Sequence, residues 1–152
     1  MKEGKKMKIG IANDHRGYKK KQYLTQFLEK LGYTVINYGT DSEESVDFPD
    51  YAKKLGIAVR EKEVDLGIAI CGTGIGMSIA LNKMHDITCA KVSSVAEAIL
   101  SKAHNDANVL AISEEMDDET TKQVVIKFIE TPFSNVKKYV VRNNKIKVID
   151  ND

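Results

Sequence analysis

The chain has 152 residues, the length of one domain, and its 42% hydrophobic and 30% charged residues are typical of a globular protein. A formal net charge of +1 argues against a dedicated nucleic-acid-binding protein, and no apolar run is long enough to predict a membrane span. The two cysteines, Cys71 and Cys89, form no disulfide framework and share no metal-ligand spacing with the histidines, which predicts a cytoplasmic protein without a metal site.

The basic start of the chain, residues 1–7, is followed by no apolar segment of the kind that a signal peptide contains. We expect these residues to be an N-terminal extension and residues 8–152 to form one domain. An apolar run at residues 8–12 predicts the first strand, and an amphipathic pattern at 18–31 predicts the first helix. Residues 34–38 are expected to form a second strand, followed by a polar loop and a helix from about 49 to 62.

The second half of the chain repeats this alternation three times. Strands are expected at 66–70, 87–92 and 108–112, and helices up to about residue 84, at 94–103 and at 117–130. Five alternations predict an α/β protein with a doubly wound, Rossmann-like parallel sheet of five strands between two helical layers, in the flavodoxin-type order 2-1-3-4-5. The tail, 139–149, is expected to form either a hairpin around Asn143-Asn144 or a short helix.

The most informative segment follows the third predicted strand and reads Cys71-Gly72-Thr73-Gly74-Ile75-Gly76. Glycines at a strand-to-helix turn let the backbone approach a ligand closely, and the free amides there form a cradle for an anion or an oxyanion. The segment lacks the lysine of a phosphate-binding loop, the spacing of the dinucleotide fingerprint and the arginine of a cysteine phosphatase loop. Cys71 beside an anion cradle is the functional interpretation, and a tight turn with an incidental cysteine is the alternative.

In an open parallel sheet, ligands bind beyond the carboxyl ends of the strands where the strand order reverses, here between the first and third strands. These strands end in Asp14-His15 and in Cys71, so we expect both polar residues to face the cysteine. The alternative for Asp14 is a helix cap, and that for His15 is an ordinary loop histidine.

A second polar cluster, His104-Asn105-Asp106, follows the fourth predicted helix and therefore lies at the amino end of the sheet. Within one subunit, this cluster is therefore expected to lie too far from Cys71 to contact it. Either the cluster is a helix-terminating turn, or His104 enters the site of a neighbouring subunit in a two-fold dimer.

Four stretches together resemble the ribose-5-phosphate isomerase type B family, which belongs with galactose-6-phosphate isomerase, and the resemblance runs from about residue 7 to 133. They are Asn13-Asp14-His15, residues 44–52, residues 71–80 and residues 104–110. The resemblance implies an aldose–ketose isomerase of phosphorylated sugars that uses no metal or organic cofactor and forms a homodimer with shared active sites, or a tetramer.

The resemblance also implies a role for each matching residue. Cys71 would be the base that moves a proton between C1 and C2, and His104 of the partner would help to open the sugar ring. The enediolate oxygen would be stabilised by Thr73 and by the loop amides, and the sugar would be bound by further residues, so that the substrate-binding set is Asp14, His15, Gly72, Gly74, Ile75, Gly76 and Asn105. A free thiol, with a pKa of about 8.5, suits general base catalysis near neutral pH.

The sequence departs from the family pattern at positions that normally contact the substrate or its phosphate. Phe48 stands in place of a tyrosine, and Ser113-Glu114-Glu115 in place of a Gly-x-Arg segment. The arginine-rich tail of the family is represented by Lys137, Lys138 and Arg142, which we expect to bind the phosphate. Ribose 5-phosphate is the expected substrate. The alternative substrates are another sugar or sugar phosphate, such as allose or galactose 6-phosphate. The alternative functions are a non-catalytic sugar-phosphate-binding module and a flavodoxin-like domain that binds a nucleotide or flavin.

Overall fold

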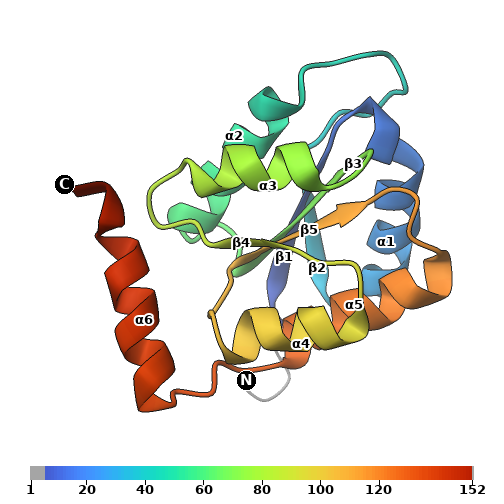
Figure 1. Cartoon of the computed structure of the whole chain (residues 1–152). Helices are drawn as coiled ribbons and strands as arrows, with labels where there is room; N and C mark the ends of the chain where they lie inside the picture. Colours follow the sequence, from blue (N-terminus) through green and yellow to red (C-terminus); the bar gives the residue numbers. More distant parts are fainter. Residues whose placement is uncertain (1–5, 152) are drawn as a thin grey trace.

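Five parallel strands form the central sheet of the computed structural model, which describes residues 6–151 (Figure 1). The strands are β1 (Lys8–Asn13), β2 (Thr34–Asn37), β3 (Leu66–Cys71), β4 (Cys89–Lys91) and β5 (Val109–Ser113). Their spatial order is β2-β1-β3-β5-β4. The doubly wound α/β class is therefore confirmed, whereas the predicted order 2-1-3-4-5 is wrong for the last two strands.

The burial of β5 explains this difference. Four of its five residues are fully buried, and it pairs with β3 on one side and with β4 on the other. By contrast, β4 has only three residues and ends at the exposed Lys91. A continuous apolar strand belongs inside a parallel sheet, and a short strand with a lysine suits an edge. β1 and β3 are direct neighbours, as the site prediction requires.

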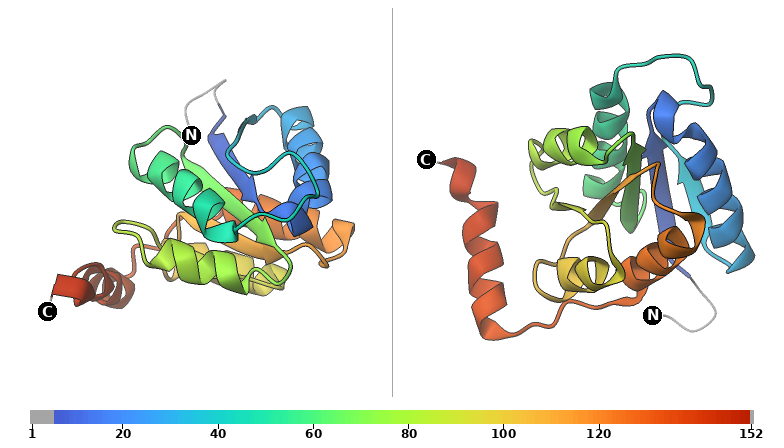
Figure 2. Two further views of the ribbon diagram at one scale, coloured as in Figure 1. Left: turned by 90° about the horizontal axis from the view of Figure 1, so that it is seen from above. Right: turned by 45° about the vertical axis from the view of Figure 1, so that its right-hand side comes forward.

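Helices cover both faces of the sheet (Figures 1 and 2). One face carries α1 (Tyr18–Lys30), α4 (Val95–Ala103) and α5 (Asp118–Glu130), and the other carries α2 (Phe48–Arg60) and α3 (Ile75–Asn82). This arrangement is the expected three-layer sandwich. It follows from right-handed crossovers in a sheet whose strand order reverses.

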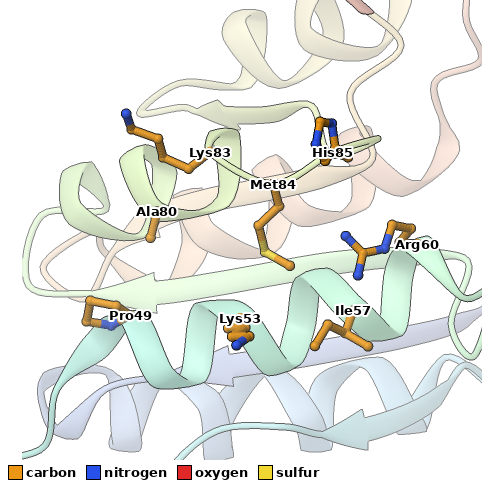
Figure 3. A pocket seen from close by; sticks show the side chains of 8 residues that line it. All are labelled: Pro49, Lys53, Ile57, Arg60, Ala80, Lys83, Met84 and His85. Atoms are coloured by element: carbon orange, nitrogen blue, oxygen red, sulfur yellow. The ribbon is translucent and has the colours of Figure 1, made fainter. Parts of the chain in front are cut away.

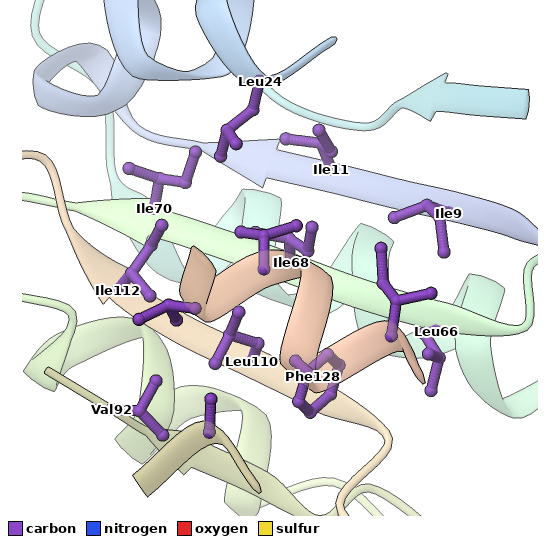
Figure 4. Close-up of a cluster of buried hydrophobic side chains, with 14 of the residues drawn as sticks. Ile9, Ile11, Leu24, Leu66, Ile68, Ile70, Val92, Leu110, Ile112 and Phe128 are labelled. Carbon is purple, nitrogen blue, oxygen red and sulfur yellow. The ribbon is translucent and has the colours of Figure 1, made fainter. Parts of the chain in front are cut away.

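The larger core lies under α1, α4 and α5, where alternate strand residues point to the same face (Figure 4). The side chains of Ile68, Ile70, Leu110 and Ile112 meet there with that of Phe128, and all five are fully buried. On the opposite face, the strands present small residues such as Ala12, Ala69 and Ala111 to α2 and α3. The ends of β1 and β3 are thereby held rigidly together.

The tail forms a helix, α6 (Lys137–Lys147), followed by a short 3-10 turn, η2 (Ile149–Asn151). Of the two predictions for the tail, the helix is correct and the hairpin is wrong. The helix extends away from the layers, as all three views show (Figures 1 and 2). Several of its apolar side chains are exposed, among them Val141 and Ile146. The side chain of Asn143, which the hairpin would have placed in a turn, is instead buried against the residues that end α4.

At the other end of the chain, residues 1–5 of the predicted extension lie outside the described residues. Met7 packs against the larger core, and its carbonyl accepts a hydrogen bond of 3.4 Å from Thr34 N. Within the described range, every helix is too short or too polar to cross a lipid bilayer.

Candidate active site

The loop between β3 and α3 is wrapped around the sulfur of Cys71, the last residue of β3. Cys71 is 5% exposed, and its Sγ accepts a hydrogen bond of 3.2 Å from the amide of Gly74. Gly74 has a φ of 82°, and a Cβ at this position would lie 3.0 Å from the carbonyl carbon of Ile112. The loop therefore requires glycine there, and the glycine amide is a hydrogen-bond donor to the sulfur.

The cradle predicted from the glycines is formed by the end of this loop and the start of α3. The hydroxyl oxygen of Thr73 accepts a hydrogen bond of 3.1 Å from Ile75 N, which closes the turn. The other amides of the first helical turn have no partner further back in the helix and are available to a ligand. Phe48, at the start of α2, covers this segment, because a Cβ on Gly76 would lie 2.8 Å from its ring.

Asp14 and His15 directly follow β1, the parallel neighbour of β3, which ends in Cys71. Asp14 N donates to Ile70 O over 3.2 Å, which joins the turn after β1 to the end of β3. The carboxylate caps the 3-10 turn η1 (His15–Gly17) by accepting a hydrogen bond of 2.9 Å from Arg16 N. The capping alternative is therefore correct for Asp14, and it coexists with a position at the site. His15 Nδ1 accepts a hydrogen bond of 3.2 Å from Val46 N, which leaves Nε2 as the ring donor.

Arg16 is a neighbour of the loop that the sequence interpretation missed. A Cβ on Gly72 would lie 3.4 Å from its Nη1, and its Nη2 donates to Glu114 Oε1 over 2.9 Å. This hydrogen bond and the charge of Glu114 raise the pKa of Arg16 above its usual value. The signal for Arg16 was its position directly after Asp14-His15 at the reversal of strand order. A cation therefore does stand beside the cysteine loop.

His104 and Asn105 form a second cluster together with α6. The ring of His104 stacks on that of Tyr139 with centroids 4.2 Å apart. Asn143 Nδ2 donates to His104 O over 2.8 Å, and Asn105 Nδ2 donates to Asn143 Oδ1 over 3.2 Å. Tyr139 and Asn143 were not predicted, because only the helical tail brings them to this turn.

The two clusters lie at opposite ends of the sheet. Asn108, just beyond the second cluster, accepts a hydrogen bond from Gly67 N at the start of β3, whereas Cys71 ends that strand. The four residue steps from Gly67 to Cys71 span about 13 Å along the strand. The three predicted phosphate-binding residues of the tail, Lys137, Lys138 and Arg142, belong to α6 and so lie with His104 rather than with Cys71. The predicted separation of His104 from Cys71 within one chain is confirmed.

Two further features lie outside these clusters. Among residues 6–151, no three histidine, cysteine or acidic side chains gather closely enough to hold a metal ion. A shallow groove of about 450 Å³ runs between α2 and α3 (Figure 3). None of the predicted site residues lines it. Its lining residues are Pro49, Lys53, Ile57, Arg60, Ala80, Lys83, Met84 and His85.

Comparison with known proteins agrees with the fold. A putative sugar phosphate isomerase of Rickettsia bellii is 43% identical over 126 residues, which cover 82% of this chain and 88% of the relative. Ribose-5-phosphate isomerase B of Escherichia coli is 46% identical over 104 residues, which cover 68% of this chain and 70% of that protein. A solved structure of Clostridium thermocellum ribose-5-phosphate isomerase B superposes with a TM-score of 0.92 at 42% identity, covering 95% of this chain and 98% of the other.

The family model described as Ribose/Galactose Isomerase matches residues 9–146, a range that includes β1, the cysteine loop, the His104 cluster and nearly all of α6. The match therefore extends beyond residue 133, where the resemblance in the sequence was expected to end. With a matching family model, the same fold and relatives above 40% identity, this chain belongs to the ribose/galactose isomerase family of enzymes.

Proposed function

We propose that this enzyme interconverts ribose 5-phosphate and ribulose 5-phosphate through an enediolate, with Cys71 as the base and without a cofactor. The observation that carries the proposal is the hydrogen bond from Gly74 N to Cys71 Sγ at the N-terminus of α3. The names of the Escherichia coli and Clostridium thermocellum relatives support the choice of substrate. Because a thiol base works only when reduced, the proposed compartment is the cytoplasm.

The proposed reaction moves one proton from C2 to C1 and a second proton from the oxygen at C2 to the oxygen at C1. The Cys71 thiolate takes the proton from C2 of the open-chain aldose, and the electron pair moves onto the oxygen at C1. The amides of Gly72 and Gly76 and the hydroxyl of Thr73 stabilise that oxygen as charge develops on it. The amide of Gly74 stays on the sulfur, and that of Ile75 stays on the Thr73 hydroxyl oxygen. The same sulfur then protonates C1, and a proton passes from the hydroxyl at C2 to the oxygen at C1. Asp14 and His15 bind the hydroxyl groups of the sugar.

The complete site is proposed to form across a homodimer or within a tetramer of such dimers. His104 lies at the far end of the sheet from Cys71, so it can assist ring opening only in the site of a second subunit. Asn105 accompanies it as a sugar-binding residue, and Lys137, Lys138 and Arg142 bring positive charge from the same helix. A two-fold axis gives each subunit both halves of the arrangement.

The first experiment measures isomerisation of ribose 5-phosphate, in the presence of a chelator, by the wild type and by two matched variants. Cys71→Ala is expected to lower kcat by roughly two to four orders of magnitude. Cys89→Ala removes the other free thiol, which is buried in β4, and is expected to keep near wild-type kcat. Equal activity of Cys71→Ala and the wild type would refute the role of the base.

One observation favours a second candidate for the substrate. The segment after β5 presents Glu114 and Glu115 instead of an arginine, and a carboxylate repels a phosphate dianion. If the wild type does not turn over ribose 5-phosphate, a panel that includes allose 6-phosphate and galactose 6-phosphate tests for another sugar phosphate. Binding of these compounds without turnover would identify a non-catalytic sugar-phosphate-binding module.

A further inference from the structure

Arg16 occupies a fixed position at the mouth of the cysteine loop. It lies in η1, between β1 and α1, and its backbone amide is held by the Asp14 carboxylate at 2.9 Å. This turn is joined to β3 by the hydrogen bond from Asp14 N to Ile70 O. The guanidinium lies against Gly72, the first residue of the loop, which has no side chain to separate it from the backbone.

Glu114 engages only part of this guanidinium. A single contact of 2.9 Å joins Arg16 Nη2 to Glu114 Oε1, and the arginine side chain is 52% exposed. Arginine carries five N–H donors in a planar fork, so donors remain free on the exposed side. Glu114 is itself anchored to the loop, because its amide donates to Cys71 O over 2.9 Å. Both members of the pair are thus fixed beside the proposed base, Arg16 through the turn after β1 and Glu114 through its hydrogen bond to Cys71 O.

We propose that Arg16 binds the phosphate of the substrate, and that Glu114 holds the guanidinium in position until the phosphate displaces it. This inference rests on the proposed function. Arg16 belongs to the chain that supplies Cys71, whereas Lys137, Lys138 and Arg142 lie on α6 at the opposite end of the sheet. A phosphate dianion accepts two parallel hydrogen bonds from a guanidinium, which is a stronger interaction than one contact with a partly exposed carboxylate.

If Arg16 and Glu114 formed only a structural ion pair, a different result would be expected. An exposed salt bridge contributes little to stability, and the loss of either partner acts in the same direction. In the proposed arrangement the two partners act in opposite directions on phosphate. Arg16 attracts it, whereas Glu114 repels it and competes for the same donors. Opposite shifts in the affinity for phosphate therefore distinguish a binding residue and its competitor from a surface pair.

The test uses Arg16→Ala, Arg16→Lys and Glu114→Gln in the full chain, with ribose 5-phosphate as substrate and inorganic phosphate as a competitive inhibitor. Arg16→Ala is expected to raise both the KM and the phosphate inhibition constant about tenfold or more, with kcat changed little. Arg16→Lys is expected to fall between Ala and the wild type, because a lysine keeps the charge but not the fork. Glu114→Gln keeps a hydrogen-bond acceptor, removes the negative charge and is expected to lower both constants.

Arg60→Ala is the matched control. Arg60 ends α2, its Nε lies 3.8 Å from a carboxylate oxygen of the neighbouring Glu61, and its removal changes the net charge by the same amount. It is expected to leave both constants unchanged. Unchanged phosphate inhibition in Arg16→Ala, or shifts in the same direction for Arg16→Ala and Glu114→Gln, would overturn the proposal.

Failure of the proposed function is separable from failure of this inference. If the wild type turns over no sugar phosphate, the proposed function fails, and the rise in melting temperature with inorganic phosphate still reports binding. Loss of that rise in Arg16→Ala would support Arg16 as the phosphate ligand. An equal rise in Arg16→Ala and the wild type would refute it.

Discussion

Gly74 determines the geometry around the sulfur of Cys71 more directly than any side chain does. Its positive φ turns the backbone so that its amide points at Sγ, and its lack of a side chain lets the loop lie against the end of β5. The residue thus combines a conformational requirement with a chemical one. A substitution there is expected to affect both stability and turnover.

Gly74→Ala is expected to lower the free energy of unfolding by about 1–2 kcal/mol, the cost of a left-handed conformation with a side chain. It is also expected to lower kcat at least about tenfold, because the amide that donates a hydrogen bond to the sulfur moves away from it. Gly32→Ala is the control, because Gly32 has a φ of 94° but lies at the end of α1. Similar destabilisation with unchanged kcat is expected there, and equal kcat losses in both variants would contradict the role of the Gly74 amide.

The buried thiol of Cys89 is expected to make the stability of the protein depend on pH. Burial raises the pKa of Cys89 to about 12, whereas an exposed thiol has a pKa of about 8.5. Between these values the unfolded chain loses the thiol proton first and binds fewer protons than the folded chain, so the free energy of unfolding falls as the pH rises. This contribution is complete below about pH 8.5 and is lost as the pH approaches about 12.

Denaturant unfolding of the wild type and of Cys89→Ala between pH 8 and pH 10.5 measures this loss. Above about pH 9, the stability advantage of the wild type over the variant is expected to shrink by about 1.4 kcal/mol per pH unit. A constant difference across this range would show that the thiol is not kept neutral in the folded chain.

At the scale of single residues, the sequence identified the candidate site residues that belong to local sequence patterns. Cys71 follows an apolar strand and precedes three glycines, and Asp14 ends the strand that neighbours it, so topology alone brought them together. The pair formed by Arg16 and Glu114 joins residues 98 positions apart. No local pattern encodes such a contact, because it depends on which strand occupies the place next to β3.

At the scale of elements, the sequence predicted the five strands and the helices α1 to α5 but not the order of all the strands. The apolar periodicity identified β4 and β5, and the burial of β5 decided which of the two lies inside the sheet. The tail was ambiguous because Asn143-Asn144 suits a turn as well as a helix surface. The long-range contacts of Asn143 and Tyr139 with the end of α4 favour the helix.

Asn143→Ala tests whether α6 positions the His104 turn. The substitution leaves the His104 carbonyl and the Asn105 side chain without this partner, and it is expected to cost about 1–2 kcal/mol of stability. Because His104 is proposed to assist ring opening, kcat with the cyclic sugar is expected to fall several-fold, while an open-chain substrate analogue is affected less. Asn144→Ala, at the exposed neighbouring position, is the control. Equal effects of the two variants would show that Asn143 of α6 does not position the His104 turn.

At the scale of the whole molecule, the proposed site requires two chains. A mixture of Cys71→Ala and His104→Ala chains, each nearly inactive alone, tests this directly after the subunits have exchanged. In a mixed dimer one site carries both substitutions and the other carries neither. About a quarter of the wild-type activity is therefore expected in an equal mixture. No recovery, with exchange verified by mass-tagged chains, would show that each site is built within one chain.

The separate origins of the site residues affect how the family can diverge. The base lies on the loop after β3, whereas Arg16 lies on the turn after β1 and Glu114 lies after β5. Residues that bind the charged end of a substrate can therefore be exchanged between loops while the thiol and its amides stay unchanged. Such modularity lets a lineage acquire a new sugar without rebuilding its acid–base chemistry, because one rigid sheet edge supports both parts independently.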